Sequence, residues 1–481
     1  MLEILLSLAI VTQDQIPLRA SPEENAARHA VLSHGDALEV RGEKGDYLQV
    51  YDHRRERAGY IFATQATRHE LTAQAAPKLL AVTEFLMNQP GNEALGLAYG
   101  AAFLKAAPPE MINAGVFEAL GTMADRLAWR ASRVTPNDTA RTVSAHIETA
   151  ASYGVSFYSV ERNDKMTLCY SGDAWRHVLA LPASSAQKAN AALSLTRHEC
   201  VKPTLLPSER LDFDLERAEA LGRVLEDGAR RGDLPEHMRN RLKIRAAGVW
   251  ASIAHRRAMK PGSDAFSVLE AGRNAETFLA GIDKNELTAN DRLAWNAAAI
   301  RVGASRWALH PQTLAQTVKG RPGIQIVAGE KPGQTCVKVI PANADKNAAD
   351  NSTHCTYGHV WTASLSVSPD GNLMTLAVQP LDAWRELWVF RQGSDGWQLE
   401  IVPPSVDNPE LGYIEFAGWV PGNRQMLVAR EIVVNGQAKT SFELWDRNTL
   451  TVARHADKPG NLSAFYRWQD PVWKNGTMAV R

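Results

Sequence analysis

The sequence lacks net charge, because its 53 lysine and arginine residues equal its 53 aspartate and glutamate residues. A chain without excess charge creates no long-range field that would concentrate it on nucleic acid or on an anionic membrane. It also lacks any apolar run near the roughly eighteen residues that a membrane-spanning helix requires. We therefore expect no nucleic-acid partner and no transmembrane segment.

Catalytic signatures are also missing from the 481 residues. We find no G-x-S-x-G elbow, no H-E-x-x-H, no phosphate-binding G-x-x-x-x-G-K-[ST] and no G-x-G-x-x-G after a strand. The common hydrolases and nucleotide-dependent enzymes are therefore disfavoured. We predict no cofactor and no catalytic residue, and we expect binding rather than catalysis.

Cysteine is scarce, and no C-x-x-C pair occurs among the four cysteines of the chain. They fall into two local pairs, Cys169 with Cys200 and Cys336 with Cys355. An even count in local pairs is typical of disulfides in an oxidising compartment, whereas four buried thiols in a cytosolic protein are the alternative. We predict two disulfides and a periplasmic or extracellular location, with the cytoplasm as the alternative.

A zinc site is the competing use of the second cysteine pair. The segment "HCTYGH", residues 354–359, places two histidines beside Cys355, with Cys336 nearby in sequence. Adjacent histidine and cysteine rarely ligate one ion, and the spacing matches no common zinc module. We therefore predict no metal ligand in the chain.

The first ten residues, "MLEILLSLAI", lack the basic region and the cleavage site of a secretion signal. We interpret them as the lead-in to a first strand, and an export segment upstream of this chain is an open alternative. The length and the apolar content of 45% predict two to four packed domains.

Residues 8–67 contain short alternating segments separated by turn residues, which predict strands. The stretches "PLRASP", "HGDALEV", "GDYLQVYD" and "AGYI" resemble the successive strand signatures of the bacterial SH3 family. The resemblance covers only this first segment. It implies an SH3-like β-barrel that binds cell-wall peptide or a partner protein, or that serves as a structural appendage.

The aromatic and basic residues of this segment form the predicted ligand-binding site. Tyr47, Tyr51 and Tyr60 stand on expected strands beside a charged turn that contains Arg54 and Arg57. Tyrosine rings offer flat apolar faces with polar edges, which suit a peptide or a sugar-peptide, although Tyr47 and Tyr60 could equally be packing residues. Side chains alternate along a strand. The residues expected to point into the core are Leu48, Val50 and Ile61.

Residues 70–310 show helical periodicity interrupted by short Gly, Pro or Asp breaks. This pattern is typical of stacked helical hairpins of the tetratricopeptide sort, but no clean period of about 34 residues occurs, so a plain helical bundle is the alternative. Near residues 153–182, alternation and an Asn-Asp turn predict an inserted β-hairpin with Cys169 on its second strand.

Residues 323–481 are again strand-like and rich in tryptophan. Segments beginning at "SLSVSPDGNLMTLAV" and "IEFAGWVPGNRQMLVAREI" each predict a four-stranded unit, and a third unit is expected from "YRWQDPVWKNGTMAV". The units resemble, more weakly, the blades of WD40-like β-propellers. Because a closed ring needs four or more blades, either residues 323–345 supply another blade or the sheets form an open stack.

Together the segments predict a multidomain α+β protein with an SH3-like barrel, a central helical region and an antiparallel, propeller-like C-terminal domain. All three types usually bind other molecules. We therefore predict a non-catalytic bacterial cell-envelope binding or scaffolding protein whose partner is a cell-wall peptide or an envelope protein. The alternatives are a peptidoglycan hydrolase with an unrecognised catalytic region and a cytosolic regulatory scaffold.

Overall fold

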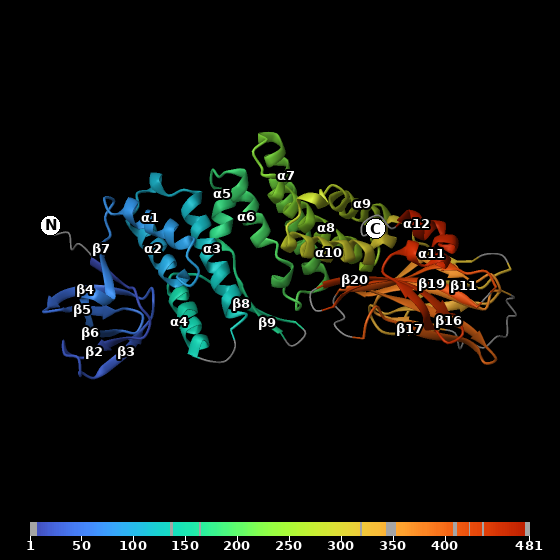
Figure 1. The fold of residues 1–481 in the computed structure, drawn as a ribbon, viewed down its shortest axis with the longest axis horizontal. Coiled ribbons are helices and arrows are strands. Elements are labelled where there is room, and N and C mark those ends of the chain that lie inside the picture. The colour runs from blue at the N-terminus through green and yellow to red at the C-terminus, as the bar shows by residue number, and fades with distance from the viewer. Residues whose placement is uncertain are drawn as a thin grey trace. The chain divides into compact units, whose positions relative to one another are not determined.

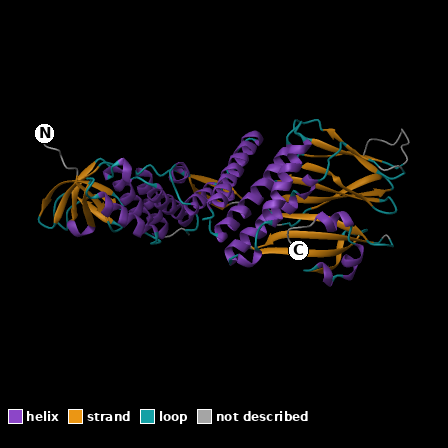
Figure 2. Ribbon diagram, turned by 90° about the horizontal axis from the view of Figure 1, so that it is seen from above, coloured by secondary structure: helices purple, strands orange, loops and turns teal. Residues whose placement is uncertain are grey.

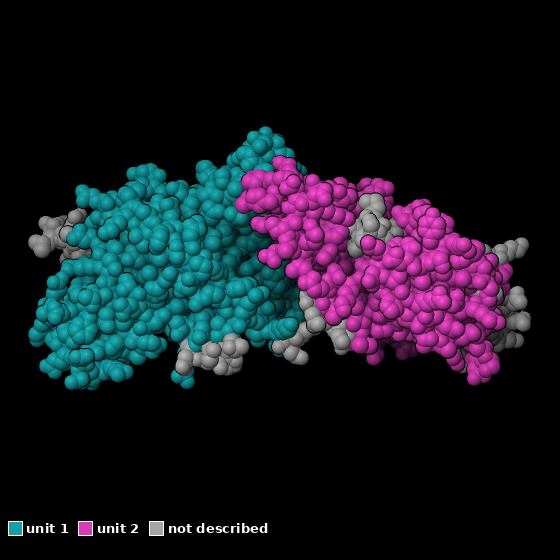
Figure 3. Space-filling view, viewed as in Figure 1, with its two compact units in different colours: residues 1–204, 224–234 teal, residues 205–223, 235–481 magenta. Residues whose placement is uncertain are grey.

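The chain divides into two compact units (Figure 3). Unit 1 comprises residues 1–204 and 224–234, and unit 2 comprises residues 205–223 and 235–481. The computed structural model describes residues 7–134, 138–162, 165–317, 320–342, 353–406, 411–422, 424–434 and 437–476. No helix among these residues is both long enough and apolar enough to span a membrane.

Unit 1 begins with an antiparallel sheet of seven strands (Figure 1). The strands are β1 (Ser7–Val11), β2 (Ile16–Arg19), β3 (Arg28–Leu32), β4 (Ala37–Lys44), β5 (Tyr47–Asp52), β6 (Arg57–Phe62) and β7 (Ala66–Glu70), with a 3-10 turn, η1 (Ala63–Gln65), before β7. Their order is β3-β2-β6-β5-β4-β1-β7. Among the described residues no ladder joins β3 to β7, so the pairing shows a sheet with two edges and not the closed barrel that the resemblance implied.

One face of this sheet forms an apolar core. Leu48, Val50 and Ile61 are buried in it, which confirms the prediction that they point inward. Gly59 lets β6 approach β2 closely, because a Cβ at this position would lie 2.7 Å from the Leu18 side chain. The alternation of β5 and the missing side chain at Gly59 thus fix the register of this part of the sheet.

Helices follow the sheet in unit 1. They are α1 (Ala76–Met87), α2 (Glu93–Ala106), α3 (Ala114–Ala131), α4 (Asp138–Ser152), α5 (Asp173–Ala180) and α6 (Ser185–Leu195), with 3-10 turns η2 (Pro109–Met111) and η3 (His198–Cys200). Gly100 allows α3 to pack closely on α2, because a Cβ there would lie 2.6 Å from the Leu120 side chain. The helices share one apolar core.

The predicted hairpin is present but shorter than expected. Its strands are β8 (Phe157–Arg162) and β9 (Lys165–Tyr170), with Cys169 on β9 as predicted. The rest of the expected hairpin is wrong, because residues 173–180 form α5, which buries Trp175 and Val178 at helical spacing. Cys169 is bonded to Cys200 in η3, so the first predicted disulfide joins the hairpin to the segment after α6.

Unit 2 contains the remaining long helices. They are α7 (Pro207–Arg231), α8 (Glu236–Met259), α9 (Ala265–Ala280) and α10 (Ala289–Ala304), with 3-10 turns η4 (Lys284–Glu286) and η5 (Arg306–Leu309). Residues 224–231 of α7 belong to unit 1. The side chains of Asp264 and Thr288 accept hydrogen bonds from backbone amides in the first turns of α9 and α10, which explains where these helices begin.

The strands of unit 2 form two sheets beside these helices (Figure 2). The four-stranded sheet consists of β10 (Ala315–Gln316), β11 (Gly323–Ala328), β12 (Thr335–Ile340) and β13 (Thr353–Thr356). Cys336 on β12 lies directly opposite Cys355 on β13, and the two form the second predicted disulfide. Both disulfide predictions are therefore confirmed.

The eight-stranded sheet contains the two predicted four-stranded units. One consists of β14 (His359–Val367), β15 (Leu373–Leu381), β16 (Trp384–Gly393) and β17 (Gly396–Val402), and the other of β18 (Gly412–Trp419), β19 (Gln425–Val434), β20 (Gln437–Asp446) and β21 (Thr451–Ala456). Parallel pairing between β16 and β18 joins them. The units are therefore parts of one mixed sheet and not separate blades.

The third predicted strand unit is wrong. Its segment forms two short helices, α11 (Ser463–Trp468) and α12 (Pro471–Gly476). Phe465 and Trp473 pack against Phe442 of β20, and the rings of Phe442 and Phe465 lie 5.2 Å apart between centroids. Helical spacing brings these aromatic side chains onto the sheet, and Pro471 suits the first position of a helix.

Candidate functional site

The register of β5 and β6 places the predicted tyrosines on the face of the N-terminal sheet opposite its core. Tyr47 pairs with Phe62, and Gln49 pairs with Tyr60. Paired residues share a face, and Leu48 and Val50 alternate with these residues along β5. We define the outer face as the surface formed by Tyr47, Gln49, Tyr51, Tyr60 and Phe62.

The tyrosines of the outer face differ in accessibility. Tyr47 is buried and stacks on Phe62 with 4.3 Å between ring centroids, so it is a packing residue. Tyr60 and Tyr51 are half-buried. The outer face therefore offers two partly accessible rings to a ligand.

Charged side chains surround Tyr51. The Arg41 guanidinium lies 4.0 Å from the centre of the Tyr51 ring, and the His53 ring meets its edge at 4.8 Å. Glu39 accepts two hydrogen bonds of 3.2 Å from Arg41 and lies 2.7 Å from His53 Nε2. These contacts, with Arg41 first, hold the pKa of the Glu39 carboxyl below its usual value. The ring therefore lies in a mixed aromatic and ionic environment.

The two arginines of the predicted site lie elsewhere. Arg54 pairs with the buried Asp36 at 3.1 Å and donates to Thr149 of α4 at 3.3 Å. Arg57 is exposed, but it precedes Tyr60 by three positions on β6. An odd spacing along a strand places the two side chains on opposite faces. The structure thus brings Tyr51 and Tyr60 together on one surface and separates Arg54 and Arg57 from it.

Asp36 is the carboxylate that engages Arg54. Its carboxylate is 4% exposed and pairs with both Arg54 and Arg55, while Thr149 Oγ1 donates to it at 3.0 Å. A buried carboxylate needs such compensation, because desolvation otherwise disfavours its charge. The contacts link the sheet to α4 within unit 1, so Arg54 serves the fold.

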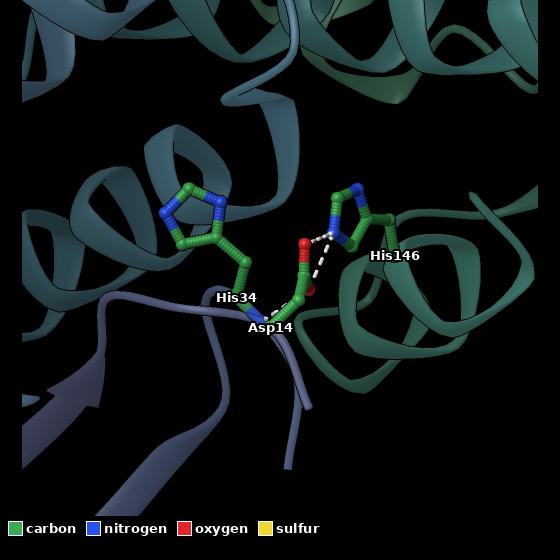
Figure 4. Close-up of side chains that lie close together, drawn as sticks. All are labelled: Asp14, His34 and His146. Atoms are coloured by element: carbon green, nitrogen blue, oxygen red, sulfur yellow. Dashed lines mark hydrogen bonds and ion pairs between the residues drawn. The ribbon is translucent and has the colours of Figure 1, made fainter. Parts of the chain in front are cut away.

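The same junction holds a cluster that sequence reasoning missed. Asp14, His34 and His146 lie close together although Asp14 and His146 are 132 positions apart in sequence (Figure 4). These are residue types that bind metal ions, but no local motif signals them. Only the packing of α4 against the turns of the sheet assembles the cluster.

Unit 2 has a largely buried carboxylate of a different kind at Asp382, whose side chain is 13% exposed. It contacts Arg256 at 2.9 Å, Arg210 at 3.1 Å and His255 Nδ1 at 3.3 Å. Burial would raise the pKa of Asp382, but the hydrogen bond with His255 and the arginine charges hold it well below its usual value. His255 Nε2 lies 3.2 Å from the carbonyl oxygen of Gln379, so this nitrogen does not face a nucleophile as it would in a catalytic triad.

A second charge network of unit 2 borders a small pocket of about 90 Å³. Glu415 is buried and contacts Arg385 at 2.7 Å, Arg306 at 2.8 Å and Trp473 Nε1 at 2.8 Å. Burial lowers the pKa of Arg385 to about 10. The Arg306 ion pair holds η5 on the sheet and the Trp473 hydrogen bond holds α12 there, and the pocket has room for several water-sized groups.

The histidines beside the second disulfide take no part in a metal site. Both thiolates that a zinc ion would need are consumed by the bond between Cys336 and Cys355. His359 is half-buried with its ring 4.3 Å from that of Trp361, and desolvation lowers its pKa to about 3. The competing zinc interpretation of "HCTYGH" is therefore excluded.

Comparisons with protein-family models, with curated proteins and with solved structures find no match to this chain. Membership of the first segment in the bacterial SH3 family stays a prediction that rests on its motifs. Function is therefore argued from the geometry of the outer face and of the buried clusters.

Proposed function

We propose that this protein is a non-catalytic binding or scaffolding protein of the bacterial cell envelope. Its SH3-like N-terminal sheet contacts a cell-wall peptide or an envelope protein through the outer face. The observation that carries this proposal is the register of β5 and β6, which sets Tyr51 and Tyr60 on the surface opposite the core. The two disulfides support an oxidising compartment.

The chemistry of the outer face favours a ligand that combines a planar amide with a carboxylate. Half-buried tyrosine rings provide surfaces on which amides or sugar rings stack. Arg41 lies over Tyr51 and already forms a two-point contact with the carboxylate of Glu39. A ligand carboxylate can compete for that guanidinium, because arginine matches carboxylate geometry. Cell-wall peptides carry both groups.

The test compares two single variants of the full chain. Tyr51→Ala removes a ring from the outer face, and Tyr466→Ala removes a tyrosine that is 74% exposed in unit 2. Binding to insoluble cell wall and to soluble cell-wall peptides is measured by sedimentation and by calorimetry. We expect Tyr51→Ala to weaken binding about tenfold, which matches a lost aromatic contact of about 1.4 kcal/mol. Equal binding by both variants, or no binding by the natural chain, contradicts the proposal.

The hydrolase alternative makes a different prediction for the same material. A hydrolase releases soluble fragments from dye-labelled cell wall, whereas a binding protein retains the label in the sediment. Release that grows with time and with protein concentration would replace the proposed function. Binding without release supports it.

A further inference from the structure

The cluster at Asp14, His34 and His146 is built by three separate parts of unit 1 (Figure 4). Asp14 lies in the turn after β1, His34 in the turn before β4, and His146 on α4. The turn at His34 is closely packed, because Gly35 has a φ of 91° and a Cβ there would lie 2.6 Å from the carbonyl oxygen of Ala94. The positions of the cluster are therefore set by the fold.

The Asp14 carboxylate is held from two sides. The backbone N–H of His34 donates to its Oδ1 at 3.0 Å, and the Nε2 of His146 lies 2.9 Å from the same oxygen. The rings of His34 and His146 lie 6.0 Å apart between centroids, on either side of Asp14 in the close-up view (Figure 4). Both imidazoles thus flank one carboxylate.

The separations between donor atoms suit a bound ion. One ligand atom from each of the three residues can be chosen so that all lie within 4.8 Å of one another. Donors around a tetrahedral zinc ion, with bonds near 2.1 Å, lie about 3.3 Å apart. To hold an ion, the donor pair at 2.9 Å has to separate slightly and the more distant donors have to approach.

Burial and access also fit a metal centre. His146 is almost fully buried, and its Nε2 faces the Asp14 carboxylate. Asp14 retains about a third of its side-chain exposure, so one side of the cluster is open to solvent.

Packing and hydrogen bonding within the protein explain only part of this arrangement. The contact between Asp14 and His146 is a hydrogen-bonded pair that needs no third residue. Among the described residues, the imidazole of His34 has no hydrogen-bond partner, since only the backbone of His34 binds Asp14. A bound ion would explain why the His34 imidazole lies beside the pair formed by Asp14 and His146.

We propose that Asp14, His34 and His146 bind a divalent transition-metal ion of the zinc class. Two imidazoles and one carboxylate are donors that suit zinc and its neighbours better than calcium or magnesium, which prefer oxygen ligands alone. No fourth histidine, cysteine, aspartate or glutamate of the described residues joins the group, so water or an external donor completes the coordination. The bound ion ties both turns of the sheet to α4.

The test uses the full chain after treatment with a chelator. Zn²⁺ is titrated by calorimetry, and Co²⁺ is added to a parallel sample to record its visible absorption bands. We expect one ion per chain with a dissociation constant at or below the micromolar range. Absence of binding by the natural chain overturns the proposal.

The decisive variant is His34→Ala, because it deletes a proposed ligand without deleting a hydrogen bond between side chains. We expect its affinity for Zn²⁺ to fall on the order of 100-fold. His237→Ala removes an exposed histidine of unit 2 and serves as the matched control, with unchanged affinity expected. Equal affinity of His34→Ala and the control shows adventitious binding at other histidines and overturns the proposal.

A second measurement covers the case in which a variant does not fold. Crystals of the natural chain grown with Zn²⁺ are measured at the zinc absorption edge. An anomalous peak between Asp14, His34 and His146 supports the site, and a peak only elsewhere overturns it. Neither readout depends on cell-wall binding. A failure of the metal-site proposal can therefore be distinguished from a failure of the proposed function.

Discussion

The carboxylates of Asp14 in unit 1 and Asp382 in unit 2 show how differently two units of one chain treat the same chemical group. Asp382 has two arginines and a histidine as partners, so its charge is compensated within the protein. Asp14 has one imidazole and one backbone amide as partners, and in the described part of the chain the second imidazole, that of His34, makes no hydrogen bond of its own. Saturated ion pairs serve the fold, whereas an incompletely satisfied set of donors leaves a place for a ligand.

The largest expected effect concerns Asp382, the carboxylate whose charge is compensated within the protein. Asp382→Ala removes the largely buried carboxylate that Arg210 and Arg256 share, while Arg210 keeps its contact with Asp214. Removing one partner of a buried ion pair costs about 3 to 5 kcal/mol, so the free energy of unfolding of unit 2 should fall by that amount. Urea denaturation followed by tryptophan fluorescence reports on unit 2, where most tryptophans lie.

The control for this experiment is Asp395→Ala, which removes an exposed carboxylate of the same unit. Surface substitutions of this kind usually change stability by less than about 0.5 kcal/mol. If Asp382→Ala were no more destabilising than the control, the ion pairs of Asp382 would not stabilise the fold of unit 2.

The disulfides give the second largest expected effect, and each unit carries one. Cys336→Ser combined with Cys355→Ser opens a loop with a sequence separation of 19 in unit 2. The loop-entropy model predicts a loss of about 3 kcal/mol, and nearly the same loss for Cys169 and Cys200, whose separation of 31 is larger. Thermal or urea unfolding of the double variants measures both losses.

Thiol labelling is the control for the disulfide prediction. The denatured, non-reduced chain should take up no label, and the reduced chain should take up four labels per molecule. Labelling before reduction would show free thiols, and the inference of an oxidising compartment would lose its support.

A smaller effect on stability is expected at β5, where neighbouring residues lie on opposite faces of the strand. Val50→Ala removes two methyl groups from the core and should cost roughly 1 to 3 kcal/mol. Tyr51→Ala should leave the melting temperature nearly unchanged, because the ring lies on the outer face and is half-buried. Differential scanning calorimetry measures both. A Tyr51→Ala variant that unfolds as early as Val50→Ala would show that Tyr51 is a packing residue.

The smallest expected effect concerns the histidines beside Asp14, the carboxylate with fewer partners. In metal-free protein, His34→Ala should change the free energy of unfolding by less than about 0.5 kcal/mol, because it breaks no hydrogen bond between side chains. His146→Ala should cost about 1 to 3 kcal/mol, because the Asp14 carboxylate loses a charge-assisted partner. Chemical denaturation with a chelator present measures both, and equal losses would show that His34 has a structural role as well.

Local patterns in the sequence predicted the elements that are themselves local. Alternation placed Leu48 and Val50 in the core, and the pairing of nearby cysteines predicted both disulfides. The turn residues also marked the two four-stranded units of the large sheet. In these cases the partners lie on neighbouring strands or within a modest loop.

The features that sequence missed depend on distant packing. The sequence from Tyr466 onward predicts a strand unit because strand-like segments flank an Asn-Gly turn, yet Phe465 and Trp473 gain their burial as parts of helices against Phe442. Arg54 looked available because Asp36 and Thr149, its partners, are remote in sequence. His34 and His146 are brought together by the docking of α4, which no short motif encodes.

The parallel pairing of β16 and β18 has a consequence for the order in which the large sheet forms. Within each four-stranded unit, successive strands pair through short connections, and such contacts close quickly. The two four-stranded units pair through their backbones at Trp384 with Gly412 and at Arg385 with Tyr413, and Trp419 of β18 also donates a hydrogen bond to Ser366 of β14. Arg385 also pairs with Glu415 of β18 and donates to the carbonyl oxygen of Ala304 at the end of α10. We therefore expect each four-stranded unit to form before this seam does, and amide exchange to show the sheet opening first at the short pairing of β16 with β18.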